Sequence, residues 1–359
     1  MATAIYVTST ERLSGKTAFC IGLMRRLGRM GLNAAYMKPI STTFRTIDKQ
    51  MMDEDVPFIK SILDLPDPLE TMAPIVLTER EVKDIGENGD VRKFEARVLD
   101  AFGSVSKGRD AVVIEGTTNL REGWMVDLAP PRLSRLLAAR SVVIVPFSSS
   151  IQVIDDLLAA QNWLGNSLAG GIINFAPQGH LAFLQERAKP LLESRRIPVF
   201  AILPKERALS SVSVRELVEG LEGESLCCQN AVDELVEHLM VGAMSAESAL
   251  THFRREPNKA VITGGDRPDI QIAALETSTR CLILTGNLRP SPLIIGLAEE
   301  RGVPIILTRH DTLQAIDIIE KFFGKNRFHQ QKKVDHFEKL LNKYMDYEAL
   351  SKAFGINTH

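Results

Sequence analysis

The sequence predicts an α/β protein in which a parallel sheet, wound with helices on both faces, is followed by a smaller α/β domain and a helical tail. Three observations lead to this prediction. A buried strand at residues 4–7 runs into a tight loop and a helix, short β-branched runs alternate with helical stretches up to residue 205, and the alternation returns over residues 259–323. Continuous apolar strands separated by helices are typical of a covered parallel sheet. With 359 residues, the chain is long enough for two domains.

The loop after the first strand has the pattern of a phosphate-binding P-loop. Residues 10–17 read TERLSGKT and lead into the apolar spacing of a helix. The N–H groups of such a loop and of the helix N-terminus converge on one point and favour an anion there. Lys16 would reach the β- and γ-phosphates, and the Thr17 hydroxyl would hold Mg²⁺. Thr10 replaces the first glycine of the usual pattern, so an ordinary strand-turn-helix is the alternative interpretation.

Charged residues follow the next strands of the predicted sheet, which lie at residues 34–37, 111–114, 141–146, 171–174 and 199–204. Ligands of parallel sheets bind at the carboxyl ends of the strands. There, Lys38 could face the phosphates or an acidic substrate, or could be a solvated lysine. Glu115 could bind Mg²⁺, and its burial without a counter-charge would be costly. Asp53 and Asp55 precede an amphipathic helix, and helix capping is the expected role of one of them.

Composition predicts a soluble, cytoplasmic protein. The net charge of −2 argues against nucleic acid or an anionic membrane as a partner. No apolar run approaches the roughly 18–20 residues of a membrane span, and no secretory signal precedes the first strand. The four cysteines lack the spacing of a metal site or a disulfide framework, so reduced thiols are expected.

The order of these motifs resembles that of dethiobiotin synthetase, a P-loop ligase related to cobyrinic acid a,c-diamide synthase. The similarity extends over residues 1–205 and is carried by residues 8–17, 37–39, 53–55, 114–116 and 173–174. It implies ATP and Mg²⁺ as cofactors. The residues that it implies are Thr10, Gly15, Lys16 and Thr17 at the phosphates, Asn174 at the adenine ring, and Thr17, Asp55 and Glu115 at the metal. Lys16 and Lys38 would be the catalytic cations, with Lys38 facing the second substrate.

The chain departs from this family at three places. Ser9 replaces a glycine before the loop, residues 117–121 replace a glycine-rich stretch, and residues 147–150 replace a lysine-leucine-glycine segment. Most of these changes fall where the vitamin precursor would bind. The resemblance therefore implies nucleotide binding without dethiobiotin synthesis.

A second domain with linker helices is expected over residues 206–325. A polar, helical connection, with a serine-capped helix start near Ser213, precedes three strands at residues 259–263, 280–285 and 303–308. Candidate ligand residues at the strand ends are Gly265, Asp266, Arg267 and Gly286. The glycines permit close approach, and Arg267 could hold a carboxylate or phosphate bidentately. Alternatively, Asp266 and Arg267 pair with each other and shape the turn.

Residues 240–325 resemble the DRTGG domain through residues 241–244, 262–267, 284–286 and 303–306. The two domains in this order resemble the N-terminal, non-catalytic part of long bacterial phosphotransacetylases. In those enzymes a separate C-terminal domain transfers the acetyl group. The helical tail at residues 326–359 leaves no room for that domain, so acetyl transfer by this chain alone is not expected.

Three functions stay open on these grounds. In the favoured one, the first domain binds Mg-ATP and the second senses a small metabolite or drives homo-oligomerisation, with a regulatory output to a partner such as an enzyme of acetate metabolism. The enzymatic alternative is ATP-dependent activation of a carboxylate, as in a ligase. A dimerising ATP switch of the MinD kind is the third, although the loop has Arg12 and lacks the extra lysine typical of that group.

Overall fold

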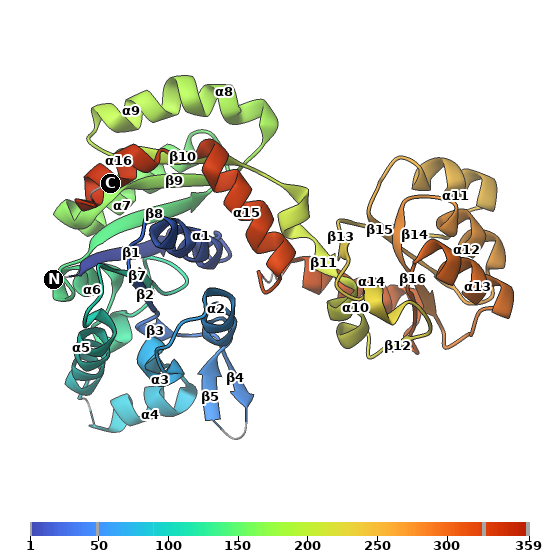
Figure 1. Ribbon diagram of the computed structural model, residues 1–359, viewed down its shortest axis with the longest axis horizontal. Helices are drawn as coiled ribbons and strands as arrows, with labels where there is room; N and C mark the ends of the chain where they lie inside the picture. Colours follow the sequence, from blue (N-terminus) through green and yellow to red (C-terminus); the bar gives the residue numbers. More distant parts are fainter. Residues whose placement is uncertain (1, 48–49, 89, 325–327, 357–359) are drawn as a thin grey trace. The chain divides into compact units, whose positions relative to one another are not determined.

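The computed structural model describes residues 2–47, 50–88, 90–324 and 328–356. Two compact units make up the chain (Figure 1): unit 1 is Met1–Lys205 together with Phe328–His359, and unit 2 is Glu206–Arg327. Unit 2 is therefore inserted between two segments of unit 1. The C-terminal segment, which the sequence analysis treats as a separate tail, lies with the P-loop unit.

Unit 1 is built on a six-stranded parallel sheet with the strand order β10-β9-β8-β1-β7-β2. The strands are β1 (Thr3–Ser9), β2 (Ala34–Met37), β7 (Ala111–Glu115), β8 (Arg140–Pro146), β9 (Leu168–Ala176) and β10 (Val199–Pro204). Each contains one of the apolar runs from which the sheet was predicted. Because both faces are covered, almost every side chain along these strands is buried.

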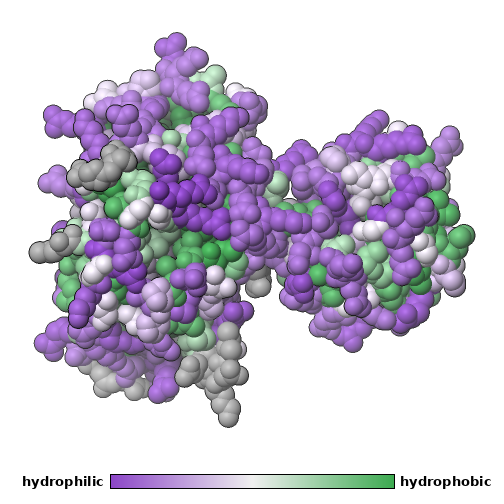
Figure 2. All heavy atoms as spheres, viewed as in Figure 1, coloured by the Kyte–Doolittle hydropathy of each residue, from purple (hydrophilic) through white to green (hydrophobic). Residues whose placement is uncertain are grey.

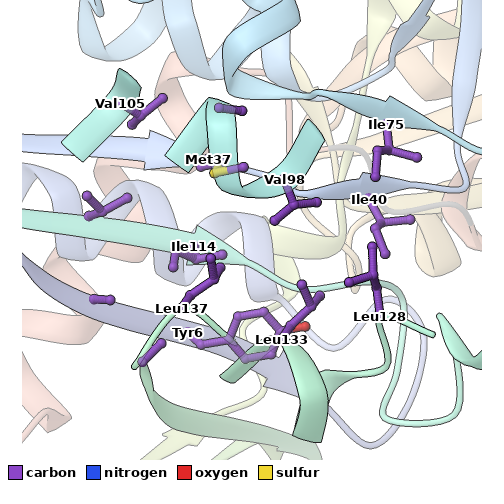
Figure 3. Packing of buried hydrophobic residues seen from close by; sticks show 14 of the residues in the cluster. Tyr6, Met37, Ile40, Ile75, Val98, Val105, Ile114, Leu128, Leu133 and Leu137 are labelled. Atoms are coloured by element: carbon purple, nitrogen blue, oxygen red, sulfur yellow. The ribbon is translucent and has the colours of Figure 1, made fainter. Parts of the chain in front are cut away.

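Helices cover both faces of this sheet, which confirms the predicted fold class. One face carries α1 (Lys16–Arg29), α15 (Gln331–Tyr344) and α16 (Tyr347–Phe354). The other carries α5 (Arg92–Ser106), α6 (Pro130–Leu136) and α7 (Gln152–Leu164), with the short α8 (Leu181–Phe183) and α9 (Lys189–Ser194) continuing along it. Figure 3 shows the packing on this second face, where Tyr6, Met37 and Ile114 of neighbouring strands meet Val98 and Leu133.

A long excursion between β2 and β7 completes unit 1. Its elements are β3 (Ile40–Ser41), β4 (Phe44–Ile47), β5 (Gln50–Asp53), α2 (Val56–Leu63), α3 (Leu69–Met72), β6 (Ile75–Val76) and α4 (Glu79–Asn88). Strands β4 and β5 form an antiparallel hairpin, and β3 pairs with β6 in parallel. The hairpin matters for the site because it returns the acids at its end to the residues that follow β2.

Unit 2 contains a five-stranded sheet with the order β12-β17-β16-β15-β14. These strands are β12 (Glu224–Ser225), β14 (His238–Val241), β15 (Lys259–Gly264), β16 (Thr279–Thr285) and β17 (Ile305–Leu307), and β12 alone runs antiparallel to its neighbour. The prediction of three strands was wrong. The two additional strands lie at the edges, in the region that was expected to be a helical connection, and are too short for an apolar run to stand out.

The helices of unit 2 give it the expected three layers. One face carries α11 (Ala246–Phe253), α12 (Pro268–Leu275) and α13 (Pro292–Arg301), and the other carries α10 (Val214–Gly220) and α14 (Thr312–Gly324). A small ribbon of β11 (Val212–Ser213) and β13 (Leu235–Val236) precedes the sheet. The predicted serine cap is confirmed, because Ser213 and Glu216 form a capping box at the start of α10.

Hydrophilic residues cover most of the face seen in Figure 2, with hydrophobic residues scattered among them. No helix in the described ranges combines the length and the apolar character that crossing a membrane requires. All four cysteines are free thiols, as the sequence analysis expects.

Candidate functional site

The P-loop connects β1 to α1 at the carboxyl edge of the six-stranded sheet, and Gly15 is the residue that makes its turn possible. Its φ of +92° lies in the left-handed region, and a Cβ atom there would lie 2.6 Å from the side-chain nitrogen of Asn174. Asn174, at the end of β9, donates this amide to the Ser14 carbonyl oxygen at 2.9 Å. This hydrogen bond fixes the loop to β9. The Asn174 side chain is buried, with 2% exposure. Its contact with an adenine ring stays a prediction.

Two hydroxyl groups of the P-loop are buried without any partner in the described part of the chain. They are Thr10 Oγ1 and Ser14 Oγ. Buried polar groups are almost always hydrogen-bonded, so each orphan needs an explanation. A loop whose N–H groups gather near two unsatisfied hydroxyls suits an anionic ligand with several acceptor oxygens.

Lys16 is almost completely buried at the base of the loop. Its ammonium group donates to Ser9 Oγ at 2.8 Å and to the Thr118 carbonyl oxygen at 2.9 Å. Burial lowers the pKa of Lys16; the charge of Glu115 opposes this shift and that of Lys38 adds to it. The lysine thus lies where the motif predicts, with its charge directed at neutral oxygens of the chain.

Glu115 joins the P-loop to the neighbouring strands. Thr17 Oγ1 donates to Glu115 Oε1 at 2.8 Å, and the Tyr36 hydroxyl donates to Oε2 at 2.9 Å. The carboxyl group is 2% exposed, and burial raises its pKa, although the charge of Lys38 acts in the opposite direction. A hydroxyl and a carboxylate side by side at the start of α1 are oxygen ligands of the kind that Mg²⁺ prefers.

Lys38 bridges the two acids that end the β4–β5 hairpin. Its ammonium group lies 2.8 Å from Asp53 Oδ2 and 3.1 Å from Asp55 Oδ2. Burial alone would lower the pKa of Lys38, but the charges of Glu115, Asp53 and Asp55 together raise it well above its usual value. Lys38 is therefore a firmly protonated, 6% exposed cation, which excludes the solvated-lysine alternative.

The two acids have different roles. Asp53 Oδ1 accepts hydrogen bonds from the backbone N–H groups of Asp55 and Val56, both at 2.8 Å, and so caps the start of α2. This is the capping role that the sequence analysis expects of one of them. Asp55 Oδ1 instead accepts a hydrogen bond from His329 Nε2, at 2.8 Å. Burial would raise the pKa of Asp55, but the hydrogen bond from His329 and the charge of Lys38 hold it well below its usual range.

The structure brings five of the predicted residues to one place, and we call this group the P-loop site: Lys16, Thr17, Lys38, Asp55 and Glu115. No cluster of three or more histidine, cysteine or acidic side chains in the described ranges is arranged to hold a metal ion on its own. A divalent cation here would therefore take part of its coordination from a ligand's phosphate oxygens, with Thr17, Asp55 and Glu115 as the residues at hand.

Sequence reasoning missed several residues of this site. Ser9 and Thr118 hold Lys16, Tyr36 holds Glu115, and His329 holds Asp55. Tyr36 lies two residues before Lys38 and could have been found as a polar group on the same strand. His329 could not have been found this way, because 274 residues separate it from its partner.

The candidate ligand residues of unit 2 lie at the carboxyl ends of β15 and β16 and differ from the prediction in one respect. Arg267 forms its ion pair with Asp269, through hydrogen bonds of 2.8 and 2.9 Å, so the alternative in which it pairs with Asp266 is wrong. Asp269 lies two residues farther along the chain, in the first turn of α12. Both of its carboxylate oxygens accept hydrogen bonds from the planar guanidinium group, so the pair is bidentate.

The two glycines of this edge have different roles. A Cβ atom on Gly265 would lie 1.8 Å from the Leu288 carbonyl oxygen, so the absent side chain makes room for the chain's own backbone. Gly286 has a φ of +72° and serves a turn. Gln271 donates to the carbonyl oxygens of Gly264 and Gly265, while its own side-chain oxygen is buried without a partner in the described residues.

Comparisons with known proteins agree with this division of the chain. The family described as AAA domain matches residues 3–213, and the DRTGG domain matches residues 216–322. The phosphate acetyltransferase of Deinococcus radiodurans is 25% identical over 313 residues, which are 82% of this chain and 43% of that protein. That of Synechocystis is 24% identical over 365 residues, covering 98% of this chain and 51% of that protein.

The chain spans about half the length of the curated relatives that it matches. A shorter match lies in the cobalt-dependent inorganic pyrophosphatase of Clostridium perfringens, which is 33% identical over 112 residues, or 31% of this chain and 20% of that protein. The predicted resemblance to a P-loop domain followed by a DRTGG domain, as in the N-terminal part of phosphotransacetylases, is confirmed.

Proposed function

This chain belongs to the AAA domain family, and from that premise we propose that it binds Mg-ATP at the P-loop site and has a regulatory or sensing role. The observation that carries the proposal is the hydrogen bond from Thr17, in the first turn of α1, to Glu115 at the end of β7, next to the buried cation of Lys16. A buried cation beside a hydroxyl–carboxylate pair matches the charges of a triphosphate and its metal ion.

Each residue has a defined part in binding. The loop N–H groups and the orphaned hydroxyls of Thr10 and Ser14 would donate hydrogen bonds to the phosphate oxygens, and Lys16 would move its ammonium group from Ser9 and Thr118 to the outer phosphates. Thr17, Asp55 and Glu115 would hold Mg²⁺, which when bound neutralises phosphate charge and fixes the geometry of the β- and γ-phosphates.

Unit 2 would supply the regulatory half of the proposal. Its DRTGG domain presents Gly265, Asp266, Arg267 and Gly286 at one sheet edge, where a small metabolite would bind or a second copy would pair. The similarity to phosphate acetyltransferases points to a partner in acetate metabolism. In this regulatory role, the chain would act by changing the activity of a partner protein and would catalyse no reaction itself.

Calorimetric titration with ATP in excess MgCl₂ tests the nucleotide premise. We expect Lys16→Ala to weaken binding about 10- to 100-fold, because a charge-assisted hydrogen bond to phosphate is lost. Lys189→Ala is the matched control, since it removes a unit 1 lysine that pairs with Glu193 on the surface of α9. Equal affinity of wild type and Lys16→Ala, or no binding by either, would remove the premise.

A second candidate function is ATP-dependent activation of a carboxylate. It is favoured by Lys38, a second buried cation whose charge reaches both Lys16 and Glu115. In that function Lys16 and Lys38 would stabilise the charge that develops on a transferred phosphoryl group. Release of ADP that depends on an added carboxylic acid would support it, and release that no acid stimulates would argue for the regulatory role.

A further inference from the structure

His329 reaches the P-loop site from the far end of the chain. Its Nε2 lies 2.8 Å from Asp55 Oδ1, and its ring packs against Phe58 of α2 with 4.9 Å between ring centres. Both side chains of this contact are about one quarter exposed, with 27% for His329 and 28% for Asp55. This contact ties the segment after unit 2 to an acid of the site.

The position of His329 in the chain gives the contact its interest. Residues 325–327 alone separate Gly324, the end of α14 in unit 2, from Phe328. On its other side, Phe328 packs edge-on against Phe337 of α15, with ring centres 5.7 Å apart. His329 thus lies at the point where the chain enters unit 1 again after unit 2.

The segment that follows is fixed to the P-loop helix. Arg25 of α1 forms ion pairs with Asp335 and Glu338 of α15, at 2.9 and 3.1 Å. Leu341 lies so close to Gly22 of α1 that a Cβ atom there would be 2.4 Å from it. α15 and α1 therefore behave as one packed pair, and a change at His329 is adjacent both to this pair and to the link with unit 2.

Both carboxylate oxygens of Asp55 are occupied by side chains. Lys38 takes Oδ2 from a buried position that it shares with Asp53, while His329 takes Oδ1 from the solvent side. A metal ion or its water at Asp55 must displace one of the two. His329 is the partner that gives way, because Lys38 is buried and its departure would also take the counter-charge from the buried Asp53.

We propose that His329 is a further positioning residue of the P-loop site, which competes with a metal ion or its water for Asp55 and so couples the site to the chain segment that leaves unit 2. The inference rests on the proposed Mg-ATP binding. Binding of Mg-ATP then releases His329, and by reciprocity any event in unit 2 that holds this segment in place weakens Mg-ATP binding.

Hydrogen exchange of the full chain without nucleotide tests the contact itself. We expect His329→Ala and Asp55→Asn each to speed exchange of the amides at residues 328–333 about five-fold, and the double variant to add nothing further. His180→Ala is the matched control, because His180 packs on Phe147 at the same 4.9 Å and its hydrogen-bond partner is the neutral Ser150 hydroxyl. Unchanged exchange in the two single variants, or additive effects, would overturn the contact.

Calorimetry then tests the competition. We expect His329→Ala to bind Mg-ATP about two- to five-fold more tightly than wild type, because a partly exposed hydrogen bond that competes for Asp55 is lost, and to bind ATP in EDTA with unchanged affinity. The Mg-ATP affinity of His329→Gln, which keeps a hydrogen-bond donor, should lie between those of wild type and His329→Ala. Equal or weaker Mg-ATP binding by His329→Ala would overturn the competition while leaving nucleotide binding intact. Absence of binding by wild type would instead refute the proposed function, and the exchange experiment would still decide the contact.

Discussion

The two sheets differ at the carboxyl edges of their parallel strands, where charged side chains are buried in unit 1 and exposed in unit 2. At the edge of the unit 1 sheet, Lys16, Lys38, Asp53 and Glu115 are all at most 8% exposed. At the corresponding edge of unit 2, the charged pair of Arg267 and Asp269 lies at the surface. Unit 2 does have a fully buried charged side chain, Lys259. It lies at the first residue of β15, at the opposite end of the strand from the carboxyl edge.

This difference shows which edge is made for a charged ligand. Burying charge is costly, and a fold that keeps several buried cations and acids together satisfies them mutually or with a ligand of matching charge. The edge in unit 2 has been filled by its own backbone, since the Leu288 carbonyl group occupies the space at Gly265. A neutral or weakly charged ligand, or a protein surface, fits such an edge better than a triphosphate does.

The largest expected effect comes from removing the central cation of the first edge. Lys38→Met should lower the free energy of unfolding of unit 1 by about 3–5 kcal/mol, because Asp53 and Asp55 lose their buried partner. Urea unfolding followed by tryptophan fluorescence measures it, since both tryptophans, Trp124 and Trp163, belong to unit 1. Arg267→Met is the control, and no measurable change in unfolding followed by circular dichroism is expected. Equal losses in the two variants would contradict the comparison.

A second prediction concerns the backbone packing of the second edge. Gly265→Ala should destabilise unit 2 by about 1–3 kcal/mol, because the new methyl group would overlap the Leu288 carbonyl oxygen. Gly296→Ala in α13 is the matched control. Its Cβ would meet nothing within 4 Å, and alanine there should stabilise the helix by about 0.5–1 kcal/mol. Thermal unfolding monitored by circular dichroism distinguishes the two, and tolerance of Gly265→Ala would mean that this edge is open.

Lys259 provides a pH test of unit 2. Burial lowers its pKa from 10.5 to about 8, and its ammonium group has the Ser278 carbonyl oxygen as hydrogen-bond acceptor at 3.1 Å. Between these two pH values the unfolded chain binds more protons than the folded one, so the free energy of unfolding should rise with pH. Lys259→Met should remove this slope and stabilise the protein at pH 7 by about 1–2 kcal/mol. Urea unfolding at pH 7 and at pH 9.5 measures both effects, and a slope that persists in the variant would assign it to another group.

The smallest expected effect is a change in Mg-ATP affinity when Lys16 loses one of its internal hydrogen-bond acceptors. Ser9→Ala removes one of the two internal acceptors of its ammonium group and should raise Mg-ATP affinity about two- to three-fold. Ser104→Ala is the control, because Ser104 donates a similar hydrogen bond to the Asp100 carbonyl oxygen from an exposed position on α5. Weaker binding by Ser9→Ala would indicate that Ser9 supports the bound position of Lys16.

Much of this site was accessible from local pattern. The position of Lys16 and Thr17 after a buried strand, and of Glu115 at a strand end, follows from apolar runs that can only be buried strands and from the known place of ligands in parallel sheets. The partners of these residues were not accessible in the same way. Whether Arg267 would pair with Asp266 or Asp269 depended on the direction of side chains at the start of α12, which periodicity does not determine.

By itself, the sequence determined the six strands of the unit 1 sheet, their winding with helices and the residues of the loop, because these depend on hydrophobic period and on turn chemistry among near neighbours. Only the tertiary structure decided that the last helices return to the P-loop unit and that His329 meets Asp55. Such pairings depend on which surfaces become adjacent once both sheets are covered, and no local pattern in the chain carries that information.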